Sequence, residues 1–125
     1  MAFAAHNVNH VDLGSVSPEQ AQVEVVESGR QLERIVSRPV RLFSFPFGGL
    51  RNIREEVRGM VTTAGYKALF SAHGGFVGSD TPVFDIPRIG VSSDHSALAL
   101  MMELEGISLK ALREWLRRLR RRTGR

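Results

Sequence analysis

The sequence predicts an α/β fold in which parallel strands alternate with helices. Short apolar runs that are typical of buried strands alternate with longer segments whose apolar residues recur at helical spacing. Helices of this length suit the crossover connections between parallel strands. Hydrophobic residues make up 42% and charged residues 24% of the 125-residue chain, as in ordinary globular domains. In such folds the working residues lie on loops at the carboxyl ends of strands.

The first two predicted elements are a short strand and a long helix. Residues 2–5 are apolar and lead into His6, as expected for a buried strand that delivers a polar side chain to its exit loop. A helix should begin at Ser17, because this serine can cap it, a proline follows, and Gln20 completes a capping box. It should end at Arg38, which precedes a proline. Its predicted buried stripe consists of Ala21, Val25, Leu32, Ile35 and Val36.

A second strand and a second helix follow. The strand is predicted over residues 40–45, and Pro46-Phe47-Gly48-Gly49 is the loop that leaves it. Asn52 is expected to cap the helix, and Gly65 to end it in a left-handed conformation. The predicted inner face of this helix consists of Ile53, Val57, Met60, Val61 and Ala64.

The remaining elements are predicted to be two strands and two helices. The strands are expected within residues 66–72 and 84–91, the second with a proline at its entrance. The helices are expected at about residues 96–104 and 108–122. His6 and the turn around Phe47 both come directly after a strand, so both should lie at the carboxyl edge of the sheet.

Two histidines, His6 and His10, stand four residues apart near the amino terminus. This separation lets both imidazoles reach one cation, and imidazole suits zinc and similar divalent metals. Two histidines can equally lie near each other on a polar loop without binding a metal. The spacing alone does not distinguish this alternative from a shared metal site. A zinc peptidase with this spacing would need glutamate where Asn7 stands, which argues against that class. The chain has no cysteine, so only His, Asp or Glu side chains could hold a metal.

Five segments of the chain occur in an order and spacing that resemble a known family. They are HNVNHVDL at 6–13, SPEQA at 17–21, RPVRLFSFPFG at 38–48, AGYKALF at 64–70 and IPRI at 86–89. Together they resemble the later half of the NodB-like polysaccharide deacetylases, the fourth carbohydrate esterase family, over about residues 3–107. An ordered series of five segments is more specific than any one of them.

The resemblance implies a fold, a reaction and a set of site residues. The fold is a distorted (β/α) barrel, and the reaction is metal-dependent removal of acetyl groups from N-acetylated sugars in polysaccharides or oligosaccharides. His6 and His10 match the two histidine ligands of a divalent metal, for which zinc is the expected ion. The backbone N–H of Phe47 matches the donor that helps to hold the oxyanion. Arg88 matches a common arginine, whose role could be to orient a site carboxylate or to form a structural ion pair.

The chain departs from the family pattern in its acidic residues. The family's paired Asp-Asp, which supplies the catalytic base and the third metal ligand, lies upstream of the histidines, and here only five residues precede His6. We therefore expect residues 1–107 to be the carboxyl-terminal portion of a deacetylase domain that is weakly active or inactive alone. The alternative is a non-catalytic remnant of the same fold that binds carbohydrate or a protein partner. A barrel without its first units leaves an open sheet edge, so self-association is expected.

Residues 108–125 form a predicted basic amphipathic tail. They carry a net charge of +7 against +4 for the whole chain, so residues 1–107 carry −3. A leucine stripe at helical spacing could pack on the domain and leave the arginines in solvent. The tail could instead bind an anionic membrane surface, whereas nucleic acid is the less favoured partner. No signal peptide is recognisable, so a cytoplasmic or membrane-peripheral location is expected for the chain as written.

Overall fold

The computed structural model describes residues 1–91, 93 and 95–107. The chain divides into two compact units, Met1–Gly90 and Val91–Arg125. The helix predicted within 108–122, and with it the proposed membrane-binding tail, lies outside the described residues. Among the helices that are described, none combines the length and apolarity needed to cross a membrane.

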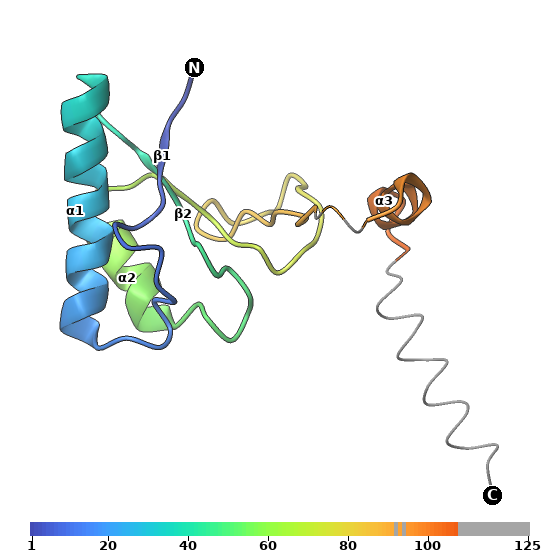
Figure 1. Cartoon of the computed structure of the whole chain (residues 1–125), viewed down its shortest axis with the longest axis horizontal. Helices are drawn as coiled ribbons and strands as arrows, with labels where there is room; N and C mark the ends of the chain where they lie inside the picture. The colour runs from blue at the N-terminus through green and yellow to red at the C-terminus, as the bar shows by residue number, and fades with distance from the viewer. Residues whose placement is uncertain (92, 94, 108–125) are drawn as a thin grey trace, which may run out of the picture. The chain divides into compact units, whose positions relative to one another are not determined.

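A three-stranded parallel sheet forms the centre of the first unit (Figure 1). Its strands β1 (Ala4–Ala5), β2 (Leu42–Ser44) and β3 (Ala68–Phe70) lie in the order β1-β2-β3. The registers pair Ala5 with Phe43, and Phe43 with Leu69. The parallel α/β architecture is therefore confirmed. The described residues form this small sheet and no closed barrel, so the distorted barrel stays a prediction.

Helix α1 spans Pro18–Val36 and begins and ends close to the predicted residues. The Ser17 side chain caps it by accepting a hydrogen bond from the Gln20 N–H, and Ser37 ends it in a left-handed conformation with φ +52°. The prediction that Ile35 belongs to the buried stripe is wrong, because this side chain is 79% exposed. At about 100° per residue, Val36 returns to the direction of Val25, whereas Ile35 falls about 80° to one side.

Helix α2 spans Glu55–Thr63, and its amino-terminal cap differs from the prediction. The cap residue is Arg54, with no side-chain capping bond. Asn52 does not cap the helix, because its side-chain amide donates instead to Asp12 Oδ2 at 2.7 Å. Ala64 was predicted on the inner face but is exposed just past the last turn of the helix. Gly65 has the expected positive φ, at +91°.

Both helices pack on one face of the sheet, and the core lies between them and the strands. The strand order proceeds in one direction, so two right-handed crossovers place α1 and α2 on the same side, where Figure 1 shows them side by side. Phe43 is fully buried at the centre, with ring centroids 5.5 Å from Phe45 and 5.2 Å from Tyr66. The other fully buried large apolar side chains are Phe45, Leu13, Val25, Val57, Val61 and Leu69.

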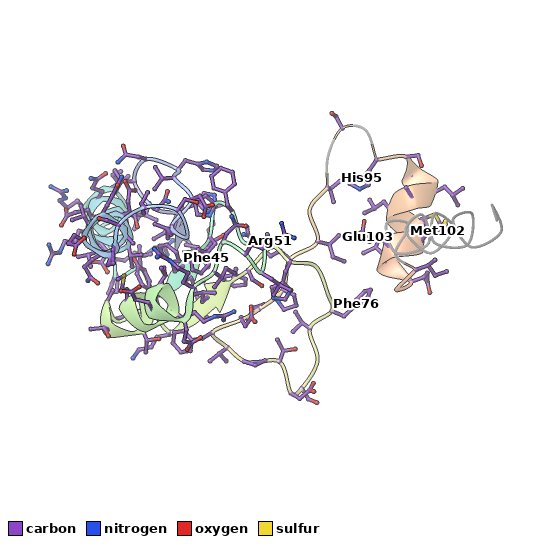
Figure 2. All side chains as sticks on the ribbon, turned by 90° about the horizontal axis from the view of Figure 1, so that it is seen from below. Phe45, Arg51, Phe76, His95, Met102 and Glu103 are labelled. Atoms are coloured by element: carbon purple, nitrogen blue, oxygen red, sulfur yellow. The ribbon has the colours of Figure 1, made fainter. Side chains whose placement is uncertain are left out.

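The segment predicted as a fourth strand makes only one bridge. Phe70 pairs with Ile86 in parallel, and the Ser71 N–H donates to the Ile86 carbonyl at 2.9 Å. Pro87 follows directly and has no backbone donor to offer a neighbouring strand. The second unit contains α3 (Ala97–Leu104), capped by Ser96, as the sequence predicts. In that unit His95 Nε2 lies 3.8 Å from Glu103 Oε2 (Figure 2).

Candidate functional site

The two histidines and the proline-containing turn meet at the carboxyl edge of the sheet. His6 directly follows β1, and the turn at residues 46–48 follows β2. The ring centroids of His6 and His10 lie 5.1 Å apart with the planes at 68°, and those of His10 and Phe47 lie 5.3 Å apart at 72°. The structure therefore brings three of the four predicted site residues into one cluster.

One hydrogen bond fixes the orientation of the His6 ring. Its Nδ1 atom lies 2.7 Å from the Ser44 carbonyl oxygen. Because a carbonyl oxygen can only accept, Nδ1 is the donor in this contact, and in the neutral imidazole this leaves the lone pair on Nε2. Metal-ligating histidines commonly have this arrangement, in which a backbone carbonyl holds the nitrogen that does not bind the metal. The Nε2 atom of His6 is thus the one that could bind a metal ion.

The loop that carries the histidines turns through two left-handed residues. Asn7 has φ +48° and His10 has φ +54°, a region that few residues other than glycine adopt. The Asn7 side-chain amide donates to the Val11 carbonyl at 2.8 Å, which closes the loop on itself. This path folds the chain back within five residues and brings the His10 ring against the His6 ring.

The residues at the site fit two ligands of a divalent metal, but the described chain does not complete the set. No group of three His, Asp or Glu side chains among the described residues could hold a metal ion. Asp12 is already engaged, since it accepts hydrogen bonds from Gly14 N, Ser15 Oγ and Asn52 Nδ2. Two buried oxygens beside His6, Asn7 Oδ1 and Ser44 Oγ, have no hydrogen-bond partner in the described part of the chain. The site therefore offers two imidazoles, and the neighbouring residues Asn7 and Ser44 each have a side-chain oxygen without a hydrogen-bond partner.

The loop between β1 and α1, residues 6–17, carries both histidines and is called the histidine loop below. Its Asp12 carboxylate joins it to the loop that enters α2. Burial alone would raise the pKa of this carboxyl, but hydrogen bonds from Ser15, Asn52 and Gly14 outweigh that effect and lower it below its ordinary value. Arg54 adds two hydrogen bonds from Nη2 to the carbonyls of Leu13 and Val16, at 3.1 and 2.9 Å. The two loops that border the candidate site are therefore fastened to each other just outside it.

The Phe47 turn is held against the end of β3 through Gly48. The Gly48 carbonyl accepts a hydrogen bond from the Ala72 N–H at 2.7 Å. The Phe47 side chain is 46% exposed. The Phe47 N–H donates to no group within the part of the chain that the structure describes.

Adding a methyl group at Gly48 is expected to disrupt the turn. A Cβ there would collide with the backbone nitrogen of Ala72, which cannot move without breaking the hydrogen bond to Gly48. We expect Gly48→Ala to lower the free energy of unfolding by about 1–3 kcal/mol. Gly59 in α2 is the matched control, because a Cβ there meets nothing within 4 Å and Gly59→Ala should stabilise the helix by about 0.5–1 kcal/mol. Urea unfolding of both variants measures the difference, and equal effects would contradict the account of the turn.

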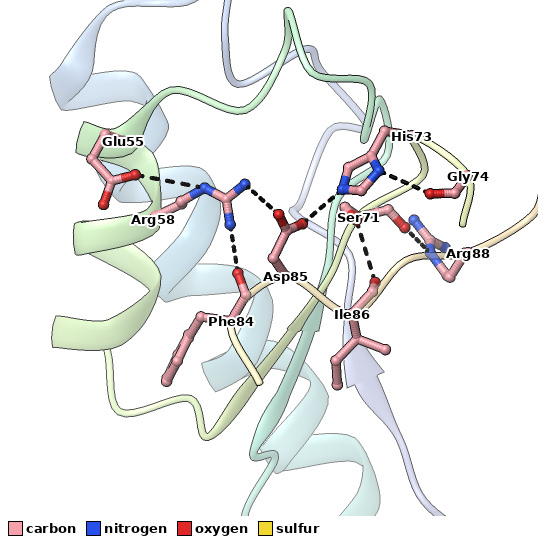
Figure 3. Close-up of polar contacts among 9 residues, drawn as sticks. All are labelled: Glu55, Arg58, Ser71, His73, Gly74, Phe84, Asp85, Ile86 and Arg88. Carbon is pink, nitrogen blue, oxygen red and sulfur yellow. Dashed lines mark hydrogen bonds and ion pairs between the residues drawn. The ribbon is translucent and has the colours of Figure 1, made fainter. Parts of the chain in front are cut away.

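Arg88 supports the same region from the segment beyond β3. Its Nε atom donates to the Ser71 carbonyl and its Nη2 atom to the Phe45 carbonyl, both at 2.8 Å (Figure 3 shows the first). Burial lowers the pKa of the guanidinium. Among the described residues Arg88 contacts no carboxylate, so here it ties the ends of β2 and β3 together. Its predicted role in orienting a site carboxylate stays a proposal.

A second polar cluster, which the sequence did not reveal, surrounds Asp85. Asp85 Oδ1 lies 2.9 Å from His73 Nε2, and its Oδ2 accepts from Arg58 Nη2 at 3.1 Å (Figure 3). Arg58 also donates to the Phe84 carbonyl at 2.6 Å. Burial would raise the pKa of Asp85, but hydrogen bonds from His73, Ser71 and Arg58 outweigh it and lower the pKa. The cluster fastens the segment after β3 to α2.

The lowered pKa of Asp85 predicts a stability change in acid. The carboxyl has a pKa below 3.8 when folded and one close to its ordinary value when unfolded. The stability that the Asp85 carboxylate gives to the folded protein is therefore fully present above the pKa of this group in the unfolded chain. It is lost as the pH falls through the pKa of the group in the folded protein. We expect Asp85→Asn to lower the free energy of unfolding at pH 7 and to have a smaller effect at pH 2.5. Urea unfolding at the two pH values tests this, and a loss that is independent of pH would contradict it.

Known proteins resemble this chain in sequence and in fold. The family model described as "Polysaccharide deacetylase" matches residues 1–69. The chain is 22% identical over 107 residues to a Bacillus subtilis (strain 168) protein provisionally named polysaccharide deacetylase YxkH, covering 86% of this chain and 37% of that protein. The solved structure of the Streptococcus pyogenes deacetylase PplD in complex with acetate matches with a TM-score of 0.68 and 21% identity, over 82% of this chain and 44% of that one. The chain thus spans less than half the length of each of these two proteins.

Proposed function

The chain belongs to the polysaccharide deacetylase family, and from this premise we propose that it forms part of a metal-dependent enzyme that hydrolyses acetyl groups from N-acetylated sugars. The observation that carries the proposal is the cluster of His6, His10 and Phe47, whose neighbouring ring centroids lie 5.1 and 5.3 Å apart. Its substrate class is acetylated polysaccharide or oligosaccharide. The proposed domain is residues 1–107, with residues 108–125 as a separate basic tail.

Each residue of the cluster has a proposed task. His6 and His10 hold a divalent metal, with zinc as the expected ion, because both are imidazoles and the His6 Nδ1 proton is already committed to Ser44. When bound, the metal supplies Lewis acidity toward the acetyl carbonyl and acidifies a water molecule. The Phe47 N–H donates to the developing oxyanion from a turn that Gly48 holds rigid. Arg88 keeps that turn in place through the Phe45 carbonyl.

Neither Asp12 nor Asp85 is available as the proton acceptor for the attacking water. In the described residues Asp12 is fully engaged in loop contacts, and Asp85 is engaged with His73 and Arg58. We propose that the base and the carboxylate ligand belong to a segment that precedes these residues in a longer polypeptide. The acetate bound to the matched Streptococcus pyogenes deacetylase supports the reaction class, because acetate is the acid that deacetylation releases.

Release of acetate from acetylated glucosamine oligomers tests the proposal. The chain and a version extended upstream by an Asp-Asp-containing segment would each be assayed with added zinc. We expect little or no acetate from the chain alone, and release from the extended version that a chelator abolishes. An extended version that releases no more acetate than the chain alone would contradict the proposal.

The second candidate function is a non-catalytic remnant of the same fold. It is favoured by the lack of a three-residue metal group among the described residues. Such a protein would bind acetylated oligosaccharide or a protein partner without releasing acetate, even in the extended version. Calorimetric titration with the same oligomers, in the presence of a chelator, distinguishes this binding from metal-dependent turnover.

A further inference from the structure

Glu24 is a buried carboxylate whose partners all lie in the histidine loop. It stands in α1 and is 3% exposed. Its Oε2 atom accepts hydrogen bonds from the backbone N–H of Val8 at 2.8 Å and of Asn9 at 2.9 Å. Its Oε1 atom accepts from the side-chain amide of Asn9 at 2.6 Å. Both residues lie between the two candidate ligands, His6 and His10.

These three hydrogen bonds explain why a charge can be buried in the apolar face of α1. An unpaired carboxylate among Ala21 and Val25 would be strongly unfavourable, whereas one that accepts three hydrogen bonds is compensated. Burial alone would raise the pKa of Glu24, but the bonds from Asn9 and Val8 outweigh it and lower the pKa, so the group stays ionised at neutral pH. The helix therefore presents a fixed negative charge to two successive N–H groups of the loop.

The two histidines differ in how they are held. His6 is oriented directly, by the hydrogen bond between its Nδ1 and the Ser44 carbonyl. His10 makes ring contacts with His6 and Phe47 and no side-chain hydrogen bond within the described part of the chain. Its position thus depends on the backbone path through residues 8 and 9 and on its own left-handed conformation. Glu24 holds that path from α1, whereas the hydrogen bond from Asn7 to the Val11 carbonyl closes the loop on itself.

We propose that Glu24 is a positioning residue for the metal site, because its hydrogen bonds to Val8 and Asn9 set the separation of the His6 and His10 rings. The inference rests on the proposed function, in which these two histidines share one cation. Glu24 does not touch the metal or the substrate in this role. It acts through the loop, as residues behind metal ligands do when they orient them.

Zinc binding and amide exchange in the full chain test this role together. Glu24→Gln keeps the side-chain volume but turns one acceptor into an amide donor that faces the loop N–H groups. We expect the amides of residues 8 and 9 to lose protection from hydrogen exchange in the metal-free protein. We expect zinc affinity, measured by competition with a chromophoric chelator, to fall by about 10- to 100-fold.

Two further variants separate positioning from general stability. Val25→Ala, at the neighbouring and fully buried position, should lower the melting temperature but leave zinc affinity and the two amides unchanged. Asn9→Ala removes only the Oε1 contact, from an exposed residue. It should weaken zinc binding by a smaller factor in a normally folded protein, which keeps the test decisive even if Glu24→Gln unfolds.

The outcomes distinguish this inference from the proposed function. Wild-type zinc affinity in Glu24→Gln, or an equal loss in Val25→Ala, would overturn the positioning role. If neither the wild-type chain nor its version extended upstream binds zinc, the proposed function fails instead. In that case the amide exchange still decides whether Glu24 holds the loop.

Discussion

Replacing His10 with alanine is expected to weaken zinc binding by at least about 100-fold. Changes to residues that only orient a metal ligand typically cost about 10- to 100-fold in affinity, so loss of a ligand itself should cost at least as much as the upper value. His6→Ala should have an equal or larger effect, because the Ser44 carbonyl prepares that ring for metal binding. Competition titration of zinc against a chromophoric chelator measures both variants.

His73→Ala is the control for this prediction. His73 is also an imidazole that follows a strand, but its ring nitrogens contact Asp85 Oδ1 and the Gly74 carbonyl, both at 2.9 Å. Its removal should leave zinc affinity unchanged while it weakens the cluster around Asp85. If His73→Ala reduces zinc binding and His10→Ala does not, the metal binds at the Asp85 cluster and the account of the histidine loop is wrong.

Replacing Phe43 with alanine should lower the free energy of unfolding by about 3–5 kcal/mol, since it removes a fully buried ring from the core. The ring contacts Phe45 and Tyr66 and stands on β2, the central strand, so the cavity would open between both neighbouring strands. Small domains are stable by only about 5–15 kcal/mol, so this loss is a large share of the total. Urea unfolding followed by circular dichroism would show it as a lower midpoint.

Ile35→Ala is the matched control for Phe43→Ala. Both remove an apolar side chain, but Ile35 is 79% exposed, so its change should stay within about 0.5 kcal/mol. A loss below about 1 kcal/mol for Phe43→Ala, or similar losses for the two variants, would show that the core is not centred on Phe43.

Local sequence patterns predicted most of the elements, because the signals for these elements lie within a few residues of one another. Ser17 caps α1, Gly65 follows α2 with a positive φ, and the three apolar runs became β1, β2 and β3. One error, the cap of α2, arose where a tertiary contact competes with local preference. Asn52 has a good capping side chain, but Asp12, forty residues earlier, takes its amide.

The arrangement of the candidate site was only partly predictable. The family resemblance identified His6, His10, Phe47 and Arg88, and the spacing of the histidines suggested a shared cation. Glu24 and the Asp85 cluster depend on contacts between residues 12 to 27 positions apart, which no local pattern encodes. Glu24 did leave one signal, since it is an acidic residue between Ala21 and Val25 on the apolar stripe of α1, where a buried charge requires partners.

X-ray absorption spectroscopy of zinc bound to the full chain, with protein in excess, tests the central claim most directly. Two imidazole nitrogens at about 2.0–2.1 Å, with oxygen ligands filling the remaining positions, are the expected coordination. In the His10→Ala variant one imidazole should be lost from the fit. A spectrum with oxygen ligands alone, or one that the His10→Ala change leaves the same, would show that the two histidines do not share a metal.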